Sequence, residues 1–281
     1  MFFKLECLNV SIVLYNTDLK LLERSVISLL KTKLNIKILL VDNSESDYLK
    51  TIRSLEPNII NYIHTGKNLG YGCANNIAIR ESINNNVKYH LVLNPDVYFD
   101  EGVLEEIFEF MEKHKEVGLI APKILYPDGT LQYQCRLLPT PFDLLGRRFL
   151  NFGYFKKFIE KRNEIHELRF TKYNQIMEVP AFQGSFLFIR TEVLKKVGLF
   201  DERFFMYMED IDLSRRIYKV SKNVFYPYVH IYHEWQRGSY KNKNLLKFHI
   251  ESAIKYFNKW GWFFDKERDK INQEVLSKLG F

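Results

Sequence analysis

Residues 36–43 read IKILLVDN, a run of branched apolar residues that ends in a carboxylate and an amide. Such a run is typical of a strand that is buried on both faces of a parallel sheet. The stretch decides the fold because runs of the same kind recur before and after it. Each run is separated from the next by a segment with the apolar spacing of a helix.

The first half of the chain alternates these two kinds of segment. We expect strands at residues 9–16, 36–43, 59–65 and 89–97, and helices at residues 19–31, 44–55, 71–85 and 102–115. Strands that alternate with helices at this spacing predict βαβ units. The expected fold is therefore α/β, with a mostly parallel central sheet flanked by helices.

Polar residues stand where the expected strands end. They are Tyr15 and Asn16, Asp42 and Asn43, and Asn94 and Asp96. In open parallel sheets, ligands bind beyond the carboxyl ends of the strands. Each residue alone also suits an ordinary turn, but the three pairs together favour a ligand site. The ligand that we expect there is a nucleotide.

The stretch NPD, residues 94–96, indicates a divalent metal ion. Mg²⁺ and Mn²⁺ prefer oxygen ligands, typically one or two carboxylates together with the phosphates of a substrate. Asp96 supplies such a carboxylate. His233, in the stretch YHEWQRGS, is a candidate second ligand, because Mn²⁺ accepts imidazole more readily than Mg²⁺ does. A single histidine is also a common structural residue.

The stretch FFMYMEDIDLSRR, residues 204–216, places three acids directly after apolar and aromatic residues. If a helix begins near Glu209, its inward stripe consists of Leu213, Ile217 and Val220. Asp212 is then expected on the outer face, in an ion pair with a following arginine. Glu209 and Asp210 flank the stripe, where first-turn acids favour the helix dipole. As desolvated carboxylates with a raised pKa, they also suit a general base.

The composition of the 281 residues suits a folded domain, since 46% are apolar. The net charge of +7 suits a polyanionic ligand or an anionic membrane face, and equally an ordinary basic protein. Three cysteines without a C-x-x-C pair do not indicate a disulfide framework. We recognise neither a signal peptide nor an apolar run near the length of a membrane span, and therefore expect a cytoplasmic protein. No nucleic-acid-binding motif is recognised, and we expect no nucleic-acid partner.

Two later regions leave the alternating pattern. Residues 136–170 mix Pro, aromatic residues and pairs of basic residues. They suit a mobile flap, an acceptor-binding insertion, an amphipathic segment that touches a membrane, or a surface excursion packed by its own aromatics. Residues 244–281 are predicted to be helical and to dock onto the core through residues at three- and four-residue spacing. These are Leu245, Phe248, Ser252, Tyr256 and Trp260.

Seven stretches occur in the order and at the spacing of one known family. They are VSIVLYN, LLVDNSES, NLGYGCANN, LNPDV, FQGSFLFIR, VGLFDERFFMYMEDIDLSRR and HEWQRGS. Over about Val10 to Gly261 the chain resembles the inverting family 2 glycosyltransferases with the GT-A fold, and among them the bacterial rhamnosyltransferase-type enzymes. The resemblance implies a GT-A domain over residues 1–243, divided into a nucleotide-binding half (1–123) and an acceptor and catalytic half (124–243). A C-terminal helical extension covers residues 244–281.

The resemblance also implies a role for individual residues on the donor side. Asp42 would accept a hydrogen bond from the pyrimidine ring N–H, with Tyr15 and Asn16 lining the same base pocket. The motif beside the nucleoside would comprise Asn68, Gly70, Tyr71 and Asn76, and in it Gly70 and Gly72 would permit close approach of the backbone. Gly184 would leave room for the donor sugar.

On the reaction side, the resemblance implies that Asp210, with Glu209 beside it, is the general base. Asp96 would hold a divalent ion, Mn²⁺ or Mg²⁺, on the diphosphate. His233 would close on the metal or the diphosphate, and Arg237 would add positive charge there. The family's metal motif is often Asp-x-Asp, and Asn94 stands in its first place, a form common among the rhamnosyltransferase-like members.

The implied activity is transfer of a sugar from a nucleotide-diphosphate donor, with inversion, to a hydroxyl of a saccharide acceptor in cell-surface polysaccharide biosynthesis. dTDP-rhamnose is the first expected donor and a UDP-hexose the second. The acceptor is expected to be lipid-linked, with the enzyme touching the cytoplasmic membrane face. A nucleotidyltransferase and a non-catalytic nucleotide-sugar binder are the alternatives.

Overall fold

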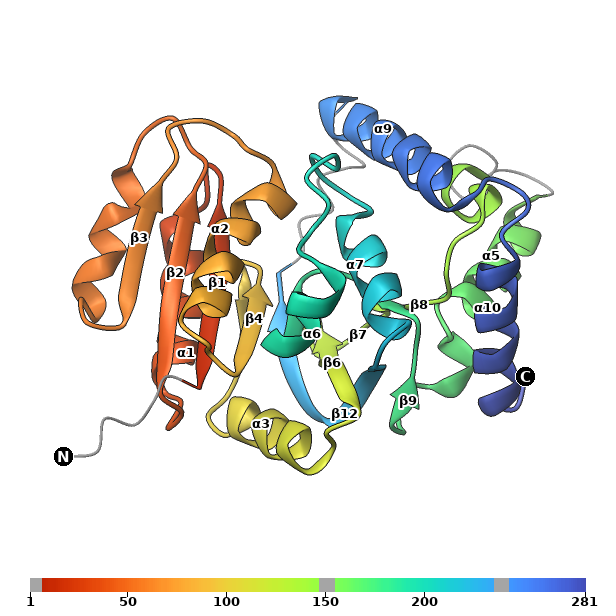
Figure 1. The fold of residues 1–281 in the computed structure, drawn as a ribbon, viewed down its shortest axis with the longest axis horizontal. Coiled ribbons are helices and arrows are strands. Elements are labelled where there is room, and N and C mark those ends of the chain that lie inside the picture. The colour runs from red at the N-terminus through yellow and green to blue at the C-terminus, as the bar shows by residue number, and fades with distance from the viewer. Residues whose placement is uncertain (1–6, 147–154, 235–242) are drawn as a thin grey trace.

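The computed structural model of the chain describes residues 7–146, 155–234 and 243–281 (Figure 1). The strands are β1 (Leu8–Leu14), β2 (Ile36–Asp42), β3 (Ile60–His64), β4 (Tyr89–Leu93), β5 (Val97–Tyr98), β6 (Val117–Leu125), β7 (Leu131–Gln132), β8 (Cys135–Arg136), β9 (Met177–Glu178), β10 (Ala181–Phe182), β11 (Phe186–Arg190) and β12 (Lys222–His233). The α-helices are α1 (Leu19–Leu30), α2 (Tyr71–Asn84), α3 (Val103–Lys113), α5 (Phe155–His166), α6 (Thr191–Val197), α7 (Glu209–Tyr218), α9 (Lys243–Trp260) and α10 (Lys266–Lys278). Short helical segments are η1 (Tyr48–Leu55), η2 (Phe142–Gly146) and η3 (Arg169–Thr171).

One ten-stranded sheet runs through the centre in the order β3-β2-β1-β4-β11-β6-β12-β5, with β7 and β9 paired to its members. Strands β3, β2, β1 and β4 are parallel, and so are β6 and β12. The antiparallel strand β11 joins these two sets. The prediction of an α/β fold with a mostly parallel central sheet is confirmed.

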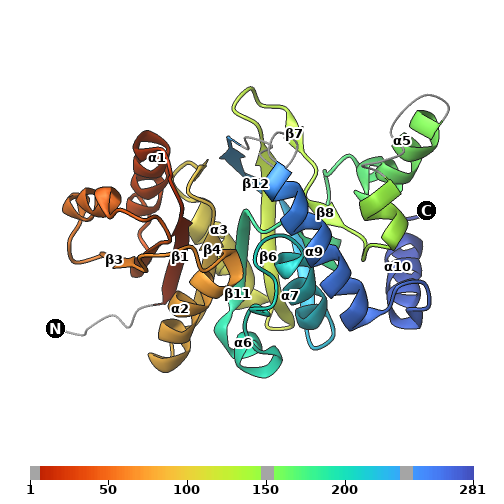
Figure 2. The same ribbon diagram turned by 90° about the horizontal axis from the view of Figure 1, so that it is seen from above.

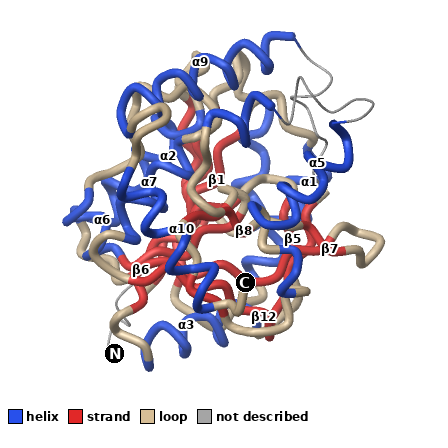
Figure 3. The backbone as a smooth tube through the Cα atoms, turned by 90° about the vertical axis from the view of Figure 1, so that its right-hand side faces the viewer, coloured by secondary structure: helices blue, strands red, loops and turns tan. Residues whose placement is uncertain are grey.

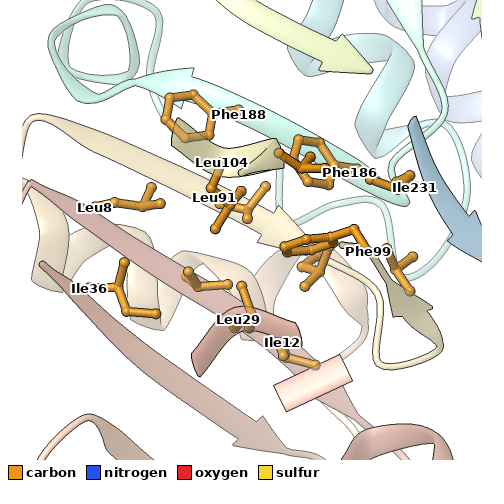
Figure 4. Packing of buried hydrophobic residues seen from close by; sticks show 14 of the residues in the cluster. Leu8, Ile12, Leu29, Ile36, Leu91, Phe99, Leu104, Phe186, Phe188 and Ile231 are labelled. Carbon is orange, nitrogen blue, oxygen red and sulfur yellow. The ribbon is translucent and has the colours of Figure 1, made fainter. Parts of the chain in front are cut away.

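Helices cover both faces of the sheet (Figure 2). On one face, α1 and α3 pack against β1 and β4, and Figure 4 shows Leu8, Leu29, Leu91 and Leu104 in this cluster. Helices α2, α6 and α7 contribute to the cluster on the other face. Strands β1, β4 and β11 are buried along their whole length, as expected for strands covered on both faces, whereas β3 and β12 keep partly exposed residues.

Two predicted boundaries differ from the observed ones by more than two residues. The helix expected over residues 44–55 begins only at Tyr48, as the 3₁₀ segment η1, because Ser44 is hydrogen-bonded to Asn16 and Asp42 at the strand ends. The strand expected over residues 89–97 stops at Leu93. Asn94 begins a turn there, and Val97 starts β5, which pairs with β12.

The C-terminal residues fold back onto the domain as two helices, as predicted. Tyr256 and Phe257 of α9 are buried in the same cluster as α7, and Val275 of α10 joins them. Figure 3 shows α9 lying across the top of the molecule, with the strands as a layer beneath it. Within the described ranges, no helix combines the length and apolar character that would let it cross a membrane.

Candidate functional site

Asp42 is the last residue of β2, which lies between β1 and β3 in the sheet. Its carboxylate is fully buried, and accepts hydrogen bonds from the Ser44 amide (2.8 Å) and from the Tyr62 hydroxyl. The Ser44 hydroxyl in turn accepts a hydrogen bond from the Asn16 amide (2.8 Å), and Tyr15 beside it is half exposed. The structure thus groups Tyr15, Asn16 and Asp42 as predicted. Tyr62, a middle residue of β3, was not predicted, because no pattern distinguishes it from a packing tyrosine.

Tyr71, the first residue of α2, links the donor side of the site to the acids of α7. Its hydroxyl lies 3.0 Å from the Asn94 side-chain oxygen and 2.7 Å from the Gly184 carbonyl oxygen. Burial raises the pKa of Tyr71 well above its ordinary value, and the charges of Glu209, Asp210 and Asp96 raise it further. All three acids therefore lie close enough to act on one phenol. Residues at the end of β4 and at the start of α7 thus lie around the same tyrosine.

The glycines of the 68–72 segment allow the protein to contact itself closely. Gly70 has φ +85°, and a Cβ atom there would lie 2.4 Å from the Phe205 carbonyl oxygen, which accepts the Tyr71 amide hydrogen (2.9 Å). A Cβ on Gly72 would lie 3.0 Å from Phe200. Close backbone approach is therefore required as predicted, but the partner in the structure is the loop that leads to Glu209.

Two asparagines of the same motif are used internally. Asn68 accepts the Gly70 amide hydrogen at 2.9 Å. Asn76 is buried, and its amide donates to the Phe200 carbonyl (2.9 Å) and to Glu202 (3.0 Å) while it accepts the Phe200 amide hydrogen (3.0 Å). The hydrogen bonds of Asn76 hold the loop after α6, and its predicted place beside the nucleoside stays a prediction.

Asp210 and Glu209 begin α7 side by side but have different surroundings. Asp210 accepts hydrogen bonds from the amides of Gly184 and Ile211, both at 2.8 Å. Glu209 is 5% exposed, and its Oε2 has no hydrogen-bond partner among the described residues. Burial and the charge of Asp210 raise the pKa of Glu209 to about 8. Near neutral pH, Glu209 is therefore the protonated member of the pair.

Burial also raises the pKa of Asp210, but the amides of Ile211 and Gly184 and the positive charge of Arg136 oppose that increase. Asp210 thus has partners that favour its ionised form, whereas the Glu209 Oε2 atom has no hydrogen-bond partner in the described residues. Gly184 contributes its amide and the space for Asp210: an added Cβ would lie 3.1 Å from the Asp210 Cβ. Its predicted role, room for a donor sugar, stays a prediction.

Arg136 is a site residue that the sequence did not reveal. It ends β8, is largely buried, and donates to the carbonyls of Tyr133 and Cys135, both at 2.8 Å. Its guanidinium also lies 3.3 Å from the buried carboxylate of Glu167. No pattern in the sequence around Arg136 indicates that its charge will act on Asp210, 74 residues later.

The backbone before the two acids is unusual. Tyr207 and Met208 have φ of +70° and +68°, a left-handed conformation that non-glycine residues seldom adopt. Helix α9 holds this loop from above, because Ser252 donates to the Met206 carbonyl (2.8 Å) and Phe248 packs on Phe205. Such conformations persist where the surrounding structure enforces them.

The prediction for Asp212 is wrong in its location. Asp212 does pair with Arg216 (2.9 Å), but it is fully buried under α9 rather than on an outer face. Lys259 (2.6 Å) and the Trp260 indole N–H (2.8 Å) complete its shell. The predicted stripe is also one residue too long, because α7 ends at Tyr218 and Val220 is exposed. The helical period predicts which residues of α7 share a face, but it does not predict that a second helix, α9, packs on the opposite face.

The predicted metal ligands lie together. The Asp96 Oδ1 and His233 Nε2 atoms are 3.3 Å apart, where β5 and β12 pair. A cation that binds two adjacent ligands at about 2.1–2.2 Å keeps them about 3 Å apart, so this spacing fits a shared ion. No cluster of three His, Cys, Asp or Glu side chains suited to a metal occurs in the described parts of the chain. The remaining ligands would come from substrate or water, and Arg237 lies outside the described residues.

The fold defines a class of protein. A mannosyltransferase from Pyrobaculum calidifontis, solved in complex with GDP-Man and Mn²⁺, superposes with a TM-score of 0.62 at 14% identity. The superposition covers 97% of this chain and 69% of the other. The fold is that of the GT-A glycosyltransferases, as the motifs predicted.

The family follows from sequence. The model of glycosyl transferase family 2 matches residues 10–198, and the chain belongs to that family. It is 29% identical over 227 residues to the N-acetylglucosaminyl-diphospho-decaprenol L-rhamnosyltransferase of Mycobacterium tuberculosis, covering 75% of this chain and 71% of the relative. It is 26% identical over 247 residues to rhamnosyltransferase WbbL of Escherichia coli K12, covering 84% and 87%. The predicted rhamnosyltransferase-like resemblance is confirmed, and the matched family region ends before Asp210 and His233.

Proposed function

We propose that the protein is an inverting glycosyltransferase that moves a sugar from a nucleotide-diphosphate donor to a hydroxyl of a saccharide acceptor. The observation that carries this proposal is the position of Tyr71. Its hydroxyl contacts Asn94 and Gly184, and its pKa responds to Asp96 on one side and to Glu209 and Asp210 on the other. A donor held at Asp96 would therefore lie next to the proposed base.

Asp210 is the proposed general base. Two backbone amides fix its carboxylate, and the protonated Glu209 beside it leaves Asp210 as the anion of the pair. The acceptor hydroxyl would lose its proton to Asp210 while its oxygen attacks the anomeric carbon from the face opposite the diphosphate. One displacement inverts the configuration and needs one base. A retaining double displacement would need a carboxylate nucleophile against the anomeric carbon.

Asp96 and His233, with Asn94 beside them, would hold a divalent ion. Bound there, the ion would neutralise the charge that develops on the departing nucleoside diphosphate. This donor set of one carboxylate and one imidazole suits Mn²⁺ better than Mg²⁺. The Mn²⁺ in the mannosyltransferase complex supports a divalent ion in this fold.

The proposed base pocket is formed by Tyr15, Asn16 and Asp42. Asp42 would accept the ring N–H of a pyrimidine, and dTDP-rhamnose is the donor favoured by the two rhamnosyltransferase relatives. A UDP-hexose is the second candidate. The roles of Asn68 and Gly70 would then be to shape the turn beside the nucleoside.

The proposed acceptor is a lipid-linked saccharide of cell-surface polysaccharide assembly, reached at the cytoplasmic face of a membrane. The decaprenol named for the mycobacterial relative supports this class of acceptor. Helix α5 exposes Lys156, Lys157 and Lys161 together with Phe158, a combination that suits an anionic lipid surface. Cosedimentation with vesicles of anionic lipid, compared with neutral vesicles, tests this contact. Equal binding to both would count against it.

A panel of nucleotide sugars tests the function. Each donor is scored by thermal shift with and without Mn²⁺, because a ligand that binds only the folded protein raises its melting temperature. The donors that bind are then incubated with a saccharide acceptor. Release of nucleoside diphosphate together with an inverted glycoside supports the proposal. Release of pyrophosphate would indicate a nucleotidyltransferase, and binding without transfer or donor hydrolysis would indicate a non-catalytic binder.

A further inference from the structure

His233 is paired with a glutamine that belongs to none of the family stretches. Gln132 ends β7 and His233 ends β12, 101 residues later, and both side chains are nearly fully buried. Two contacts join them. The Gln132 Nε2 atom lies 2.7 Å from the His233 carbonyl oxygen, and the Gln132 Oε1 atom lies 3.0 Å from the His233 Nδ1 atom.

These two contacts fix which ring nitrogen carries the proton. A carbonyl oxygen can only accept, so the Gln132 atom beside it must be the amide NH₂ group. The other Gln132 atom is then the amide oxygen, which also can only accept. His233 Nδ1 must therefore donate, and in the neutral ring the lone pair lies on Nε2.

The lone pair on Nε2 faces a second acceptor. Asp96 Oδ1 lies 3.3 Å away, and the segment is held in place because the Glu234 amide donates to the Asp96 carbonyl (3.2 Å). Two acceptors at this distance repel each other unless a proton or a metal cation lies between them. Asp96 and His233 thus form a site for a positive ion before any ligand binds. Gln132 causes this arrangement because its hydrogen bonds place the proton of the neutral ring on Nδ1.

We propose that Gln132 is a positioning residue that holds His233 in the Nδ1–H tautomer, with its Nε2 lone pair directed at the cation site beside Asp96. The proposal rests on the proposed function only in taking Asp96 and His233 as the ligands of a divalent ion. Outer partners of this kind orient metal-binding histidines, and their loss typically weakens metal affinity by about 10–100-fold.

The first test reads the tautomer without any metal. Protein labelled with ¹⁵N-histidine is prepared metal-free at pH 8, and the His233 ring signals are assigned by their loss in His233→Ala. We expect one protonated nitrogen at Nδ1 and one unprotonated nitrogen at Nε2. In Gln132→Met, which keeps the shape but removes both hydrogen bonds, we expect a mixture of tautomers.

Gln134→Met is the matched control. Gln134 is a buried glutamine two residues further along, and its amide donates to the Pro122 carbonyl, away from His233. This variant should keep the His233 signals of the wild type. A proton on Nε2 in the wild type, or an unchanged tautomer in Gln132→Met, would overturn the proposal.

The second test measures Mn²⁺ binding by calorimetry, without substrate. We expect Gln132→Met to bind Mn²⁺ about 10–100-fold more weakly than the wild type and Gln134→Met to bind it equally well. Equal affinity in Gln132→Met contradicts the positioning role. If the wild type holds the expected tautomer but does not bind Mn²⁺ even with UDP present, the positioning role stands and the proposed metal site fails.

Discussion

The donor side and the base side of the site are built in different ways. On the donor side, Asp42 and Asn94 stand at the ends of parallel strands, and the ladder of the sheet places them. On the base side, Asp210 follows two residues with left-handed backbone and begins a helix that α9 covers. Substitutions on the base side should therefore disturb stability where they break the packing between α7 and α9, whereas those at strand ends should mainly disturb binding.

The largest effect is expected for Asp210→Asn. This change removes the proposed base but keeps the shape of the side chain, and a general base typically contributes about 10²–10⁴-fold to the rate. Turnover with saturating donor should fall by at least that order, while donor affinity by calorimetry stays close to the wild type. Near-normal turnover would exclude Asp210 as the base.

Asp212→Ala tests the same helix two residues later. It removes a fully buried carboxylate from Lys259, Arg216 and Trp260, and the loss of one partner from a buried ion pair costs about 3 kcal/mol or more. Urea unfolding should report this loss. Asp210→Asn, as the control, should change the free energy of unfolding by far less. Similar losses in both variants would show that the two acids do not differ in their structural roles.

Gly70→Ala tests the contact between the two sides. At φ +85° the new Cβ would meet the Phe205 carbonyl oxygen at 2.4 Å, and we expect a loss of about 2 kcal/mol or more. Gly66→Ala is a matched control, since its φ is +68° but no heavy atom lies within 4 Å of the added Cβ. It should cost about 1 kcal/mol. If the denaturant midpoints of Gly70→Ala and Gly66→Ala fall by the same amount, the close approach of Gly70 to Phe205 does not contribute to stability.

Glu209→Gln tests the protonation state of the base side. The pKa of Glu209 in the folded protein, about 8, lies above its ordinary value of 4.5, so the folded state keeps a proton that the unfolded state releases. The resulting stabilisation is complete below about pH 4.5 and is lost as the pH rises through 8. Between pH 5 and 8, the free energy of unfolding should fall more steeply in the wild type than in the variant. The difference in slope is at most about 1.4 kcal/mol per pH unit. Parallel curves would mean that Glu209 is ionised in the folded protein.

The smallest effect is expected at the start of α1, on the donor side. Asp18 caps α1 by accepting the amide hydrogens of Lys20 (2.8 Å) and Leu21 (3.3 Å). Asp18→Ala should cost about 1 kcal/mol in thermal unfolding and leave turnover unchanged. A change in turnover would show that the start of α1 affects the reaction, contrary to this prediction.

The difference between strand ends and packed helices also explains which features could be predicted from the sequence. Runs such as residues 36–43 carry their own structure, so the strands of the first half and the polar residues at their ends were predicted within a few residues. The proximity of Asp96 and His233 was also predicted, both from the ligand preferences of divalent ions and from the resemblance to the family. Strand positions can be read from the sequence, and paired strands in a sheet place their ends next to one another. The sequence therefore indicates which strand-end residues will be neighbours.

Contacts between distant side chains carry no such pattern. Nothing in the residues around Asp212 indicates that Lys259 and Trp260 will cover it, and nothing near Gln132 indicates that it will hold His233. The same holds for Asn76, whose amide is used by Phe200 and Glu202. These residues were missed or misplaced because their roles depend on segments that meet only in the folded chain.

The partners of Asp212 indicate which part of the chain is needed to fold the helix that carries the proposed base. The resemblance places a boundary at residue 243, yet beyond it Lys259 forms an ion pair with Asp212, in the helix of the proposed base, and Trp260 donates a hydrogen bond to it. A protein shortened at that boundary would retain the whole family-matched region and every proposed catalytic residue. It would also leave Asp212 without two of its donors, so the last 38 residues belong to the smallest folding unit that can present Asp210 correctly.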